Sequence, residues 1–201
     1  MTANTHLLIF ARRPVLGRVK TRLAAGIGDA AALAVYRELL ALTYQAVANA
    51  GAPATVWLAD AQVAVNAPLP EWPGLPWQPQ PEGDLGQRME TAFATAFAAG
   101  AGKVAIIGTD CPGLKAGHLQ QAFELLETHD LVLGPATDGG YYLLGTRRLQ
   151  PELFRQKEWS TDQVLAATLA DAKRLGLSVA LLPELTDVDT EDDLRAWKVA
   201  I

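Results

Sequence analysis

Cysteine is nearly absent from this chain: Cys111 is the only one among 201 residues. A lone cysteine excludes a disulfide within the chain, and such usage is typical of a reducing compartment, so we expect a cytoplasmic protein. The apolar residues 7–11 form too short a stretch for a signal peptide and have no basic segment before them. No apolar run approaches the length that a membrane span requires, so we also expect no span.

Positive charge is in the minority as well. Lysine and arginine number 17 against 22 aspartate and glutamate, which gives a formal net charge of -5. This balance argues against a nucleic-acid or anionic-membrane partner, because both need a general basic field. Hydrophobic residues make up 50% of the chain, enough for a sizeable core, and we expect residues 1–201 to form a single domain. The oligomeric state cannot be predicted from these features.

Short apolar segments alternate with longer amphipathic ones. The expected strands cover residues 6–11, 54–59, 103–108, 130–135 and 177–182. The expected helices cover residues 30–49, 85–99 and 115–128, with a further helix after residue 162 and a short last helix that ends near Trp197. Strands that alternate with helices are typical of an α/β fold, in which helices cover both faces of a mainly parallel twisted sheet.

Several local signals fix the expected helix ends. Residues 26–28 (G-I-G) are interpreted as a turn, with Asp29 capping the helix that follows. Ser160 or Thr161 is expected to cap a later helix. Thr190 and Asp193 have the spacing of a capping box, with aspartate in place of the usual glutamate.

Other segments admit two interpretations. Residues 66–81 are rich in proline and tryptophan and predict a long loop with a short strand near Trp77. Trp72 and Trp77 either stack on a ligand or pack the loop down, and packing is the commoner outcome. Arg88, in the first turn of the helix from residue 85, faces either a ligand or water.

The stretch V-A-I-I-G-T-D-C-P-G at residues 104–113 places Asp110 just beyond a buried strand. Ligands of open α/β sheets bind beyond the carboxyl ends of strands, and hard divalent cations prefer oxygen ligands. Asp110 is therefore a candidate for holding a cation against phosphate oxygens. The alternative is a structural role, in the turn or as a cap of the next helix.

A basic segment follows the first strand. Arginine and lysine are crowded into residues 12–23 of an acidic protein, together with proline and glycine. Such a loop can cradle phosphate groups, although it lacks the Gly-Lys-Ser/Thr of a P-loop. The alternative is an exposed loop whose charges serve solubility.

Asp138, Gly139 and Gly140 form the third candidate segment. Adjacent glycines let the backbone pass close to a ligand or to a neighbouring chain segment. Asp-Gly is also a strong hairpin-turn signal. Considered together with the Asp110 loop, the segment becomes a candidate part of one site.

Four motifs in this order resemble one bacterial family. They are P-x-x-G-x-x-K-T-R-L at residues 14–23, G-T-D-C-P at 108–112, D-G-G-Y-Y-L-L-G at 138–145 and D-V-D-T-x-x-D-L at 187–194. Together they resemble the rSAM/selenodomain-associated transferase 1 family of the nucleotide-diphospho-sugar transferase (GT-A) superfamily. The resemblance spans residues 7–197 and implies a GT-A-like three-layer α/β/α sandwich.

The resemblance also implies a role for each segment. A nucleotide or nucleotide-sugar donor would bind through its phosphates to the first loop and to the residue before Asp110, a set that comprises Arg12, Arg13, Lys20, Arg22 and Thr109. Asp110 would hold Mg²⁺ or Mn²⁺, with Asp189 as a second ligand. An unknown small-molecule acceptor would lie beside Asp138, Gly139, Gly140 and Tyr141. Asp110, Asp138 and Lys20 would take part in catalysis, with Asp138 as general base or as substrate ligand.

Three functions remain open from the sequence. The family resemblance favours glycosyl transfer from a nucleotide sugar. The triplet Thr109-Asp110-Cys111 lacks the second aspartate of most glycosyltransferases of this fold. That difference favours nucleotidyl transfer, as in guanylyltransferases, with release of pyrophosphate. The third function is nucleotide binding without turnover, since a fold alone does not fix an activity.

Overall fold

A computed structural model describes residues 4–59 and 70–199. Its helices and strands, in chain order, are β1 (Thr5–Ala11), α1 (Thr21–Ile27), α2 (Asp29–Ala50), β2 (Ala54–Leu58), β3 (Trp77–Pro79), α3 (Leu85–Ala98), β4 (Lys103–Ile107), α4 (Ala116–Leu125), β5 (Leu131–Pro135), β6 (Tyr141–Thr146), the 3₁₀ turn η1 (Pro151–Leu153), α5 (Val164–Arg174), β7 (Val179–Leu181) and α6 (Glu191–Val199). Among the described residues, no helix has the length and apolar character needed to cross a membrane.

The strands form one seven-stranded sheet in the order β3-β2-β1-β4-β6-β5-β7. β1 is parallel to β2 and β4, and β5 is parallel to β7. β6 runs antiparallel to both of its neighbours, β4 and β5. The expectation of a mainly parallel α/β sheet is therefore confirmed, with β6 as the reversed strand.

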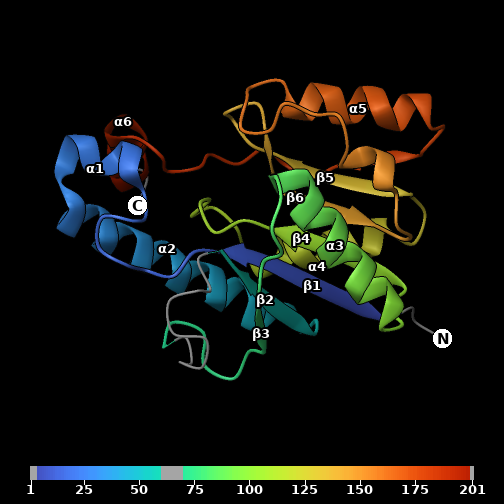
Figure 1. Cartoon of the computed structure of the whole chain (residues 1–201), viewed down its shortest axis with the longest axis horizontal. Helices are drawn as coiled ribbons and strands as arrows, with labels where there is room; N and C mark the ends of the chain where they lie inside the picture. Colours follow the sequence, from blue (N-terminus) through green and yellow to red (C-terminus); the bar gives the residue numbers. More distant parts are fainter. Residues whose placement is uncertain (1–3, 60–69, 200–201) are drawn as a thin grey trace.

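Helices cover both faces of the sheet (Figure 1). The alternating side chains of each strand divide between two cores, since successive residues point to opposite faces. Leu7 and Ile9 of β1 pack with α2 and α4, whereas Leu8 packs with α3 and with α5 residues such as Ala172. The predicted three-layer sandwich is thus the observed one.

A third apolar cluster lies outside the sheet. Leu23 of α1, Leu39 of α2 and Val188 pack together, with Trp197 of α6 against them. Figure 1 shows α1 and α6 side by side at one end of the molecule. This packing explains a wrong expectation: residues 21–27 form a helix instead of a loop and a turn, because Leu23 is fully buried against α2 and α6.

Two of the expected helix caps are wrong, whereas the expectations for Trp72 and for the strand near Trp77 are confirmed. Asp29 does not cap α2 but is its first residue, after the N-cap Gly28. Neither Ser160 nor Thr161 caps α5, which begins at Val164 after an N-cap Gln163 with no side-chain capping bond. The Thr161 hydroxyl instead donates to the Glu158 carbonyl, so the chain turns once more before the helix. The short strand near Trp77 is confirmed as β3, while residues 66–69 of the expected loop lie outside the described part. Trp72 packs as expected: it is 2% exposed and makes an edge contact with Tyr44.

The topology places the loops of interest at one edge of the sheet. The chain leaves β1 toward β2 on one side, whereas β4 continues the sheet on the other, so the loops after β1 and β4 diverge at the centre. Such a switch point forms a crevice beyond the carboxyl ends of the strands. Because β6 is antiparallel to β5, the turn between them, residues 136–140, lies at this same edge.

Candidate functional site

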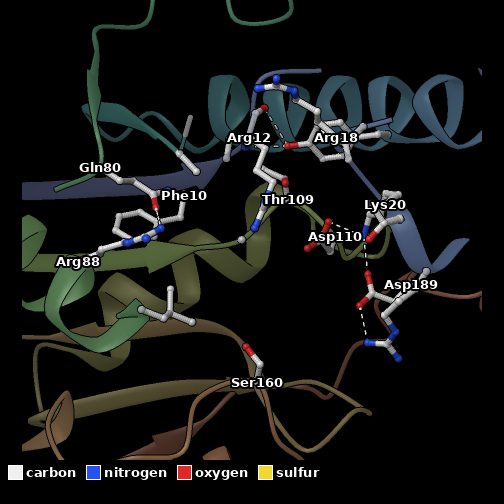
Figure 2. A pocket seen from close by; sticks show the side chains of 18 residues that line it. Phe10, Arg12, Arg18, Lys20, Gln80, Arg88, Thr109, Asp110, Ser160 and Asp189 are labelled. Carbon is white, nitrogen blue, oxygen red and sulfur yellow. Dashed lines mark hydrogen bonds and ion pairs between the residues drawn. The ribbon is translucent and has the colours of Figure 1, made fainter. Parts of the chain in front are cut away.

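The Lys20 ammonium lies between two carboxylates from distant parts of the chain. Its Nζ is 2.6 Å from Asp110 Oδ1 and 2.8 Å from Asp189 Oδ1 (Figure 2). The Lys20 side chain is 5% exposed, whereas that of Asp110 is 47% exposed. The structure therefore brings together three of the residues selected from the sequence, which come from the loops after β1 and β4 and from the segment before α6.

Charge stabilises the protonated form of Lys20. Burial by itself lowers the pKa of Lys20, but attraction by Asp110 and Asp189 outweighs it and raises the pKa above its ordinary value. Arg22 adds a second cation, with its Nη1 3.3 Å from Asp189 Oδ2. The backbone of Lys20 is left-handed, with φ 48°, and this conformation precedes the first turn of α1. It turns the chain from the β1 loop into the helix.

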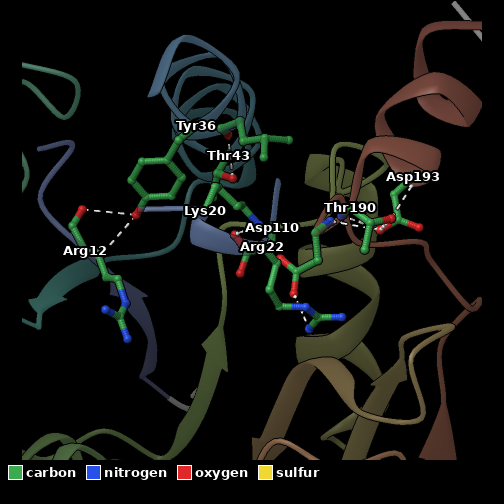
Figure 3. Close-up of polar contacts among 10 residues, drawn as sticks. Arg12, Lys20, Arg22, Tyr36, Thr43, Asp110, Thr190 and Asp193 are labelled. Atoms are coloured by element: carbon green, nitrogen blue, oxygen red, sulfur yellow. Dashed lines mark hydrogen bonds and ion pairs between the residues drawn. The ribbon is translucent and has the colours of Figure 1, made fainter. Parts of the chain in front are cut away.

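The turn before α6 fixes Asp189. Asp193 Oδ2 accepts hydrogen bonds from the backbone nitrogens of Asp189, at 3.1 Å, and Thr190, at 2.7 Å. The backbone nitrogen of Asp193 donates in turn to the Thr190 hydroxyl at 3.3 Å, which completes the predicted capping box (Figure 3). Burial raises the pKa of Asp193, but the hydrogen bonds that its carboxylate accepts from the Thr190 hydroxyl and from the two backbone nitrogens outweigh it, and the net shift is downward.

Tyr36 supports the loop that follows β1. Its hydroxyl donates to the Arg12 carbonyl at 3.0 Å and accepts from the Arg12 backbone nitrogen at 2.9 Å. Burial raises the pKa of Tyr36, so its hydroxyl stays protonated. Thr109 is 4% exposed beside this group. Arg13 lies apart: its guanidinium carbon is 5.0 Å from the centre of the Trp77 ring, and Arg13 lines neither of the two cavities described below.

A cavity of about 560 Å³ opens beside Lys20. We call it the donor cavity, after the role that the sequence resemblance implies for the loop after β1. Its cationic side chains are Arg12, Arg18, Lys20, Arg22 and Arg88. Thr109, Asp110 and Asp189 also line it. Arg88, in the first turn of α3, lines this cavity, and its Nε donates to the Gly83 carbonyl at 2.8 Å. The cavity has the size of small-molecule sites and the charge that phosphate groups require.

A second cavity of about 730 Å³ adjoins the first. We call it the acceptor cavity, after the role that the sequence resemblance implies for the segment around Asp138. Asp138, Gly140 and Tyr141, which the sequence predicts on the acceptor side, line this cavity. Asp138 Oδ1 accepts from the Gly140 nitrogen at 2.8 Å, which fixes the carboxylate. Gly139 has φ 87°, and a Cβ there would lie 2.2 Å from the Asp162 carbonyl oxygen, so its glycine is needed for this close approach of the α5 entry loop.

Asp187 is a further candidate site residue, which the sequence interpretation does not include. It lines the acceptor cavity, and its pKa is raised to about 6, first by burial and then by the charge of Asp138. The signal was available in the Asp-Val-Asp motif. Val188 is 1% exposed in the core, so the two aspartates that flank it lie on the opposite side of the extended chain.

Comparison with known proteins identifies the family of this chain. A family model described as uncharacterized protein conserved in bacteria (DUF2064) matches residues 41–161. The chain belongs to the DUF2064 family. A search among curated proteins finds no match.

Solved structures similar to this DUF2064 protein share its fold. One is a candidate nucleotide-diphospho-sugar transferase from Desulfovibrio desulfuricans G20, with 32% identity and a TM-score of 0.92, over 97% of this chain and 86% of that one. Another is Rv0371c from Mycobacterium tuberculosis H37Rv, in complex with manganese, with 20% identity, a TM-score of 0.63 and 98% coverage of each chain. A third is a nucleotidyl transferase from Methanothermobacter, with 12% identity, a TM-score of 0.64, and coverage of 98% of this chain and 96% of that one. The DUF2064 chain thus has the nucleotide-diphospho-sugar transferase fold.

The carboxylates of this site fit one kind of metal binding. Among the described residues there is no group of three or more His, Cys, Asp or Glu side chains arranged to hold a metal ion. Asp110 and Asp189, however, both lie within 2.8 Å of one lysine nitrogen. Mg²⁺ is commonly held by one or two carboxylates together with substrate phosphates. The DUF2064 site fits a cation that binds jointly with a donor, and does not fit a cation held by a cage of protein ligands alone.

Proposed function

We propose that this DUF2064 protein is a divalent-metal-dependent transferase that moves a glycosyl group from a nucleotide-sugar donor to an acceptor hydroxyl. The observation that carries the proposal is the position of Lys20. Its ammonium joins Asp110 and Asp189 at the switch point, beside a cavity rich in arginine. Cations that face carboxylates at the edge of such a sheet are suited to a metal–diphosphate group.

The donor cavity assigns a part to each side chain. Lys20 and Arg22 would neutralise the charge that develops on the leaving phosphates, and Arg12 would hold the donor from the β1 side. Asp110 and Asp189 would hold the cation, which when bound supplies Lewis-acid stabilisation to the phosphate oxygens. The manganese complex of the similarly folded Rv0371c supports a divalent cation, for which we propose Mn²⁺ or Mg²⁺.

The transfer step takes place at the boundary of the two cavities. The acceptor oxygen forms a bond to the anomeric carbon as the bond from that carbon to the phosphate oxygen breaks. The nucleoside diphosphate leaves with the bonding electron pair, and its charge is held by Lys20 and Arg22. The hydroxyl proton passes to a carboxylate in the acceptor cavity, for which Asp138 is our candidate.

A second candidate is nucleotidyl transfer, in which a nucleoside triphosphate loses pyrophosphate. The triplet Thr109-Asp110-Cys111 favours it, because the second aspartate of many glycosyltransferases is missing. The nucleotidyl transferase from Methanothermobacter has the same fold. The order of motifs favours glycosyl transfer, as in the rSAM/selenodomain-associated transferase 1 family.

Product analysis tests the proposal. The protein is incubated with Mn²⁺, a panel of nucleotide sugars or nucleoside triphosphates, and a mixture of hydroxyl compounds. We expect release of nucleoside diphosphate, and little of it with Asp138→Asn. Release of pyrophosphate would instead establish the second candidate. Donor binding with no product in any combination would indicate a binding protein without turnover and contradict both.

A further inference from the structure

The two adjoining cavities carry charge of opposite sign. They share Arg12, Arg22, Asp110 and Asp189 along their common boundary. Beyond that boundary, the charged side chains that line only the donor cavity are Arg18, Lys20 and Arg88. Those that line only the acceptor cavity are Asp138, Asp162 and Asp187. Within the described part of the chain, the acceptor cavity has no lysine, arginine or histidine beyond its boundary with the donor cavity.

Much of the rest of the acceptor cavity is apolar and partly aromatic, with Ser160 and Thr161 as further polar residues. Met89, Tyr141, Trp159 and Val164 line it. Trp159 lies tightly against α3, because a Cβ on Gly86 would approach its indole nitrogen to 2.6 Å. The indole is thus held in place at the wall, where it offers an apolar surface to a ligand. A cavity with an aromatic wall and a few placed polar groups is typical of small-molecule sites.

We infer that the acceptor is an uncharged or cationic hydroxyl compound with an apolar part, and that acceptors bearing phosphate or carboxylate are excluded. This inference rests on the proposed function, because it specifies the substrate of the same site. An anionic acceptor would place its charge beside Asp138 and Asp187, with no cation to compensate beyond the donor boundary. A hydroxyl or ammonium group can donate hydrogen bonds to these carboxylates, while its apolar part lies against Trp159.

The charge distribution of the two cavities favours one of the two transfer reactions. Nucleotidyl transfer to a phosphate acceptor needs cations around the attacking phosphate. Here the cations are gathered on the donor side, and the acceptor side has carboxylates alone beyond the boundary. A hydroxyl acceptor is therefore the class that the charge distribution favours.

The test uses four small probes of similar shape and different charge. They are 2-amino-1-phenylethanol, 1-phenyl-1,2-ethanediol, mandelate and phenyl phosphate. Binding to the full chain without donor is followed by NMR at the Trp159 indole and the Gly140 amide. We expect the cationic probe to bind most tightly and the diol next. Both anions should bind with an affinity at least roughly tenfold lower than that of the cationic probe.

Isosteric variants separate charge from shape. Asp138→Asn and Asp187→Asn should each lower the affinity for the cationic probe and raise the affinity for mandelate, and should change the affinity for the diol little. Asp192→Asn makes the same charge change at a side chain that is 93% exposed on α6, and should leave all four affinities unchanged.

Three results would overturn the inference. The first is that mandelate or phenyl phosphate binds most tightly. The second is an order of affinities that neither Asp138→Asn nor Asp187→Asn alters. The third is that neither the cationic probe nor the diol changes the NMR chemical shifts of the Trp159 indole and the Gly140 amide at its solubility limit. Failure of the proposed function is recognised separately, because it would appear as the absence of metal-dependent donor binding in an assay without these probes.

Discussion

Lys20 has two carboxylate partners that are distant in the sequence. Asp110 lies 90 positions further along the chain, and Asp189 contacts Lys20 across a separation of 169 residues. A buried ammonium is stable only with such partners, since a lone buried charge is costly. The pairing therefore couples the packing of α1 and α6 to the centre of the site.

Lys20→Met tests the phosphate-binding role of this residue. The variant keeps an unbranched side chain but leaves Asp110 and Asp189 close together without the cation. We expect donor affinity with Mn²⁺ to fall by roughly tenfold or more, as measured by calorimetric titration. Lys198→Met removes a lysine that is 46% exposed on α6 and should bind donor as the wild type does. An unchanged donor affinity in Lys20→Met would contradict the assignment.

Asp110 and Lys20 were selectable from the sequence because each follows a predicted strand within a distinctive motif. Asp189 was selectable by resemblance alone, since no local pattern links it to the β1 loop. Asp187 is not among the candidates from the sequence, although the alternation Asp-Val-Asp indicates that the two aspartates lie on the same side of the chain. The structure shows this alternation, because Val188 between them is buried. Arg13 is a candidate because of its charge, but its side chain lies over the Trp77 ring. A charge pattern in the sequence does not show in which direction a side chain points.

Helix α6 acts on the site through its first turn. Asp193 accepts hydrogen bonds from the backbone of Asp189 and Thr190, and so fixes the segment that contacts Lys20. This bond network was predictable as a capping box. Its consequence for Asp189 was not, because the position of α6 depends on tertiary packing with α1 and α2.

Asp193→Ala should loosen this segment. We expect a loss of about 1 kcal/mol of stability from the missing cap, and a several-fold loss of metal-dependent donor affinity, measured by thermal unfolding with and without ligand. The matched variant Asp192→Ala changes a neighbouring side chain that is 93% exposed, and should affect neither quantity. If Asp193→Ala lowers stability but binds donor normally, α6 has no part in positioning Asp189.

An ion pair with Lys157, whose side chain is 2% exposed, holds helix α5 in place. Lys157 pairs with Asp171, which also accepts from Arg174 at 3.0 Å. Burial raises the pKa of Asp171, but the bonds from Lys157 and Arg174 outweigh it, and the pKa lies below its ordinary value of 3.8. A lowered pKa means that the folded state binds the proton less readily than the unfolded state.

The pair therefore stabilises the fold above pH 3.8, and its contribution is lost as the pH falls through the lowered pKa of the folded state. Asp171→Asn should lower the free energy of unfolding by roughly 2 kcal/mol near neutral pH, because Lys157 loses its carboxylate partner. Denaturant unfolding of both proteins as a function of pH measures this. The difference in the free energy of unfolding between the wild type and Asp171→Asn should become smaller below pH 3.8. A difference that is constant with pH would show that the pair contributes no charge-dependent stability.

At the scale of the whole molecule, the sequence predicted most of the architecture. Apart from β6, which was not predicted as a strand, the apolar strands and the sandwich with helices on both faces are as expected, because local periodicity and burial dictate them. The reversed direction of β6 follows from a hairpin turn at Asp138 that the sequence also allowed. Helix α1 was not predicted, since its stability comes from packing of Leu23 against distant segments. The opposite charge of the two cavities likewise emerges only when all the loops are assembled.

The central claim is that Asp110 holds a cation jointly with a nucleotide donor. Thermal unfolding of the wild type and Asp110→Asn with Mn²⁺, across a panel of nucleotide sugars and nucleoside triphosphates, tests it most directly. A donor at about 100 times its dissociation constant should stabilise the wild type by roughly 2.7 kcal/mol, a shift of about 5 to 10 °C. We predict that this shift requires the metal and disappears in Asp110→Asn, whose folded spectrum and unfolding without ligand remain close to those of the wild type. An equal, metal-dependent shift in Asp110→Asn would contradict the claim and place the cation elsewhere.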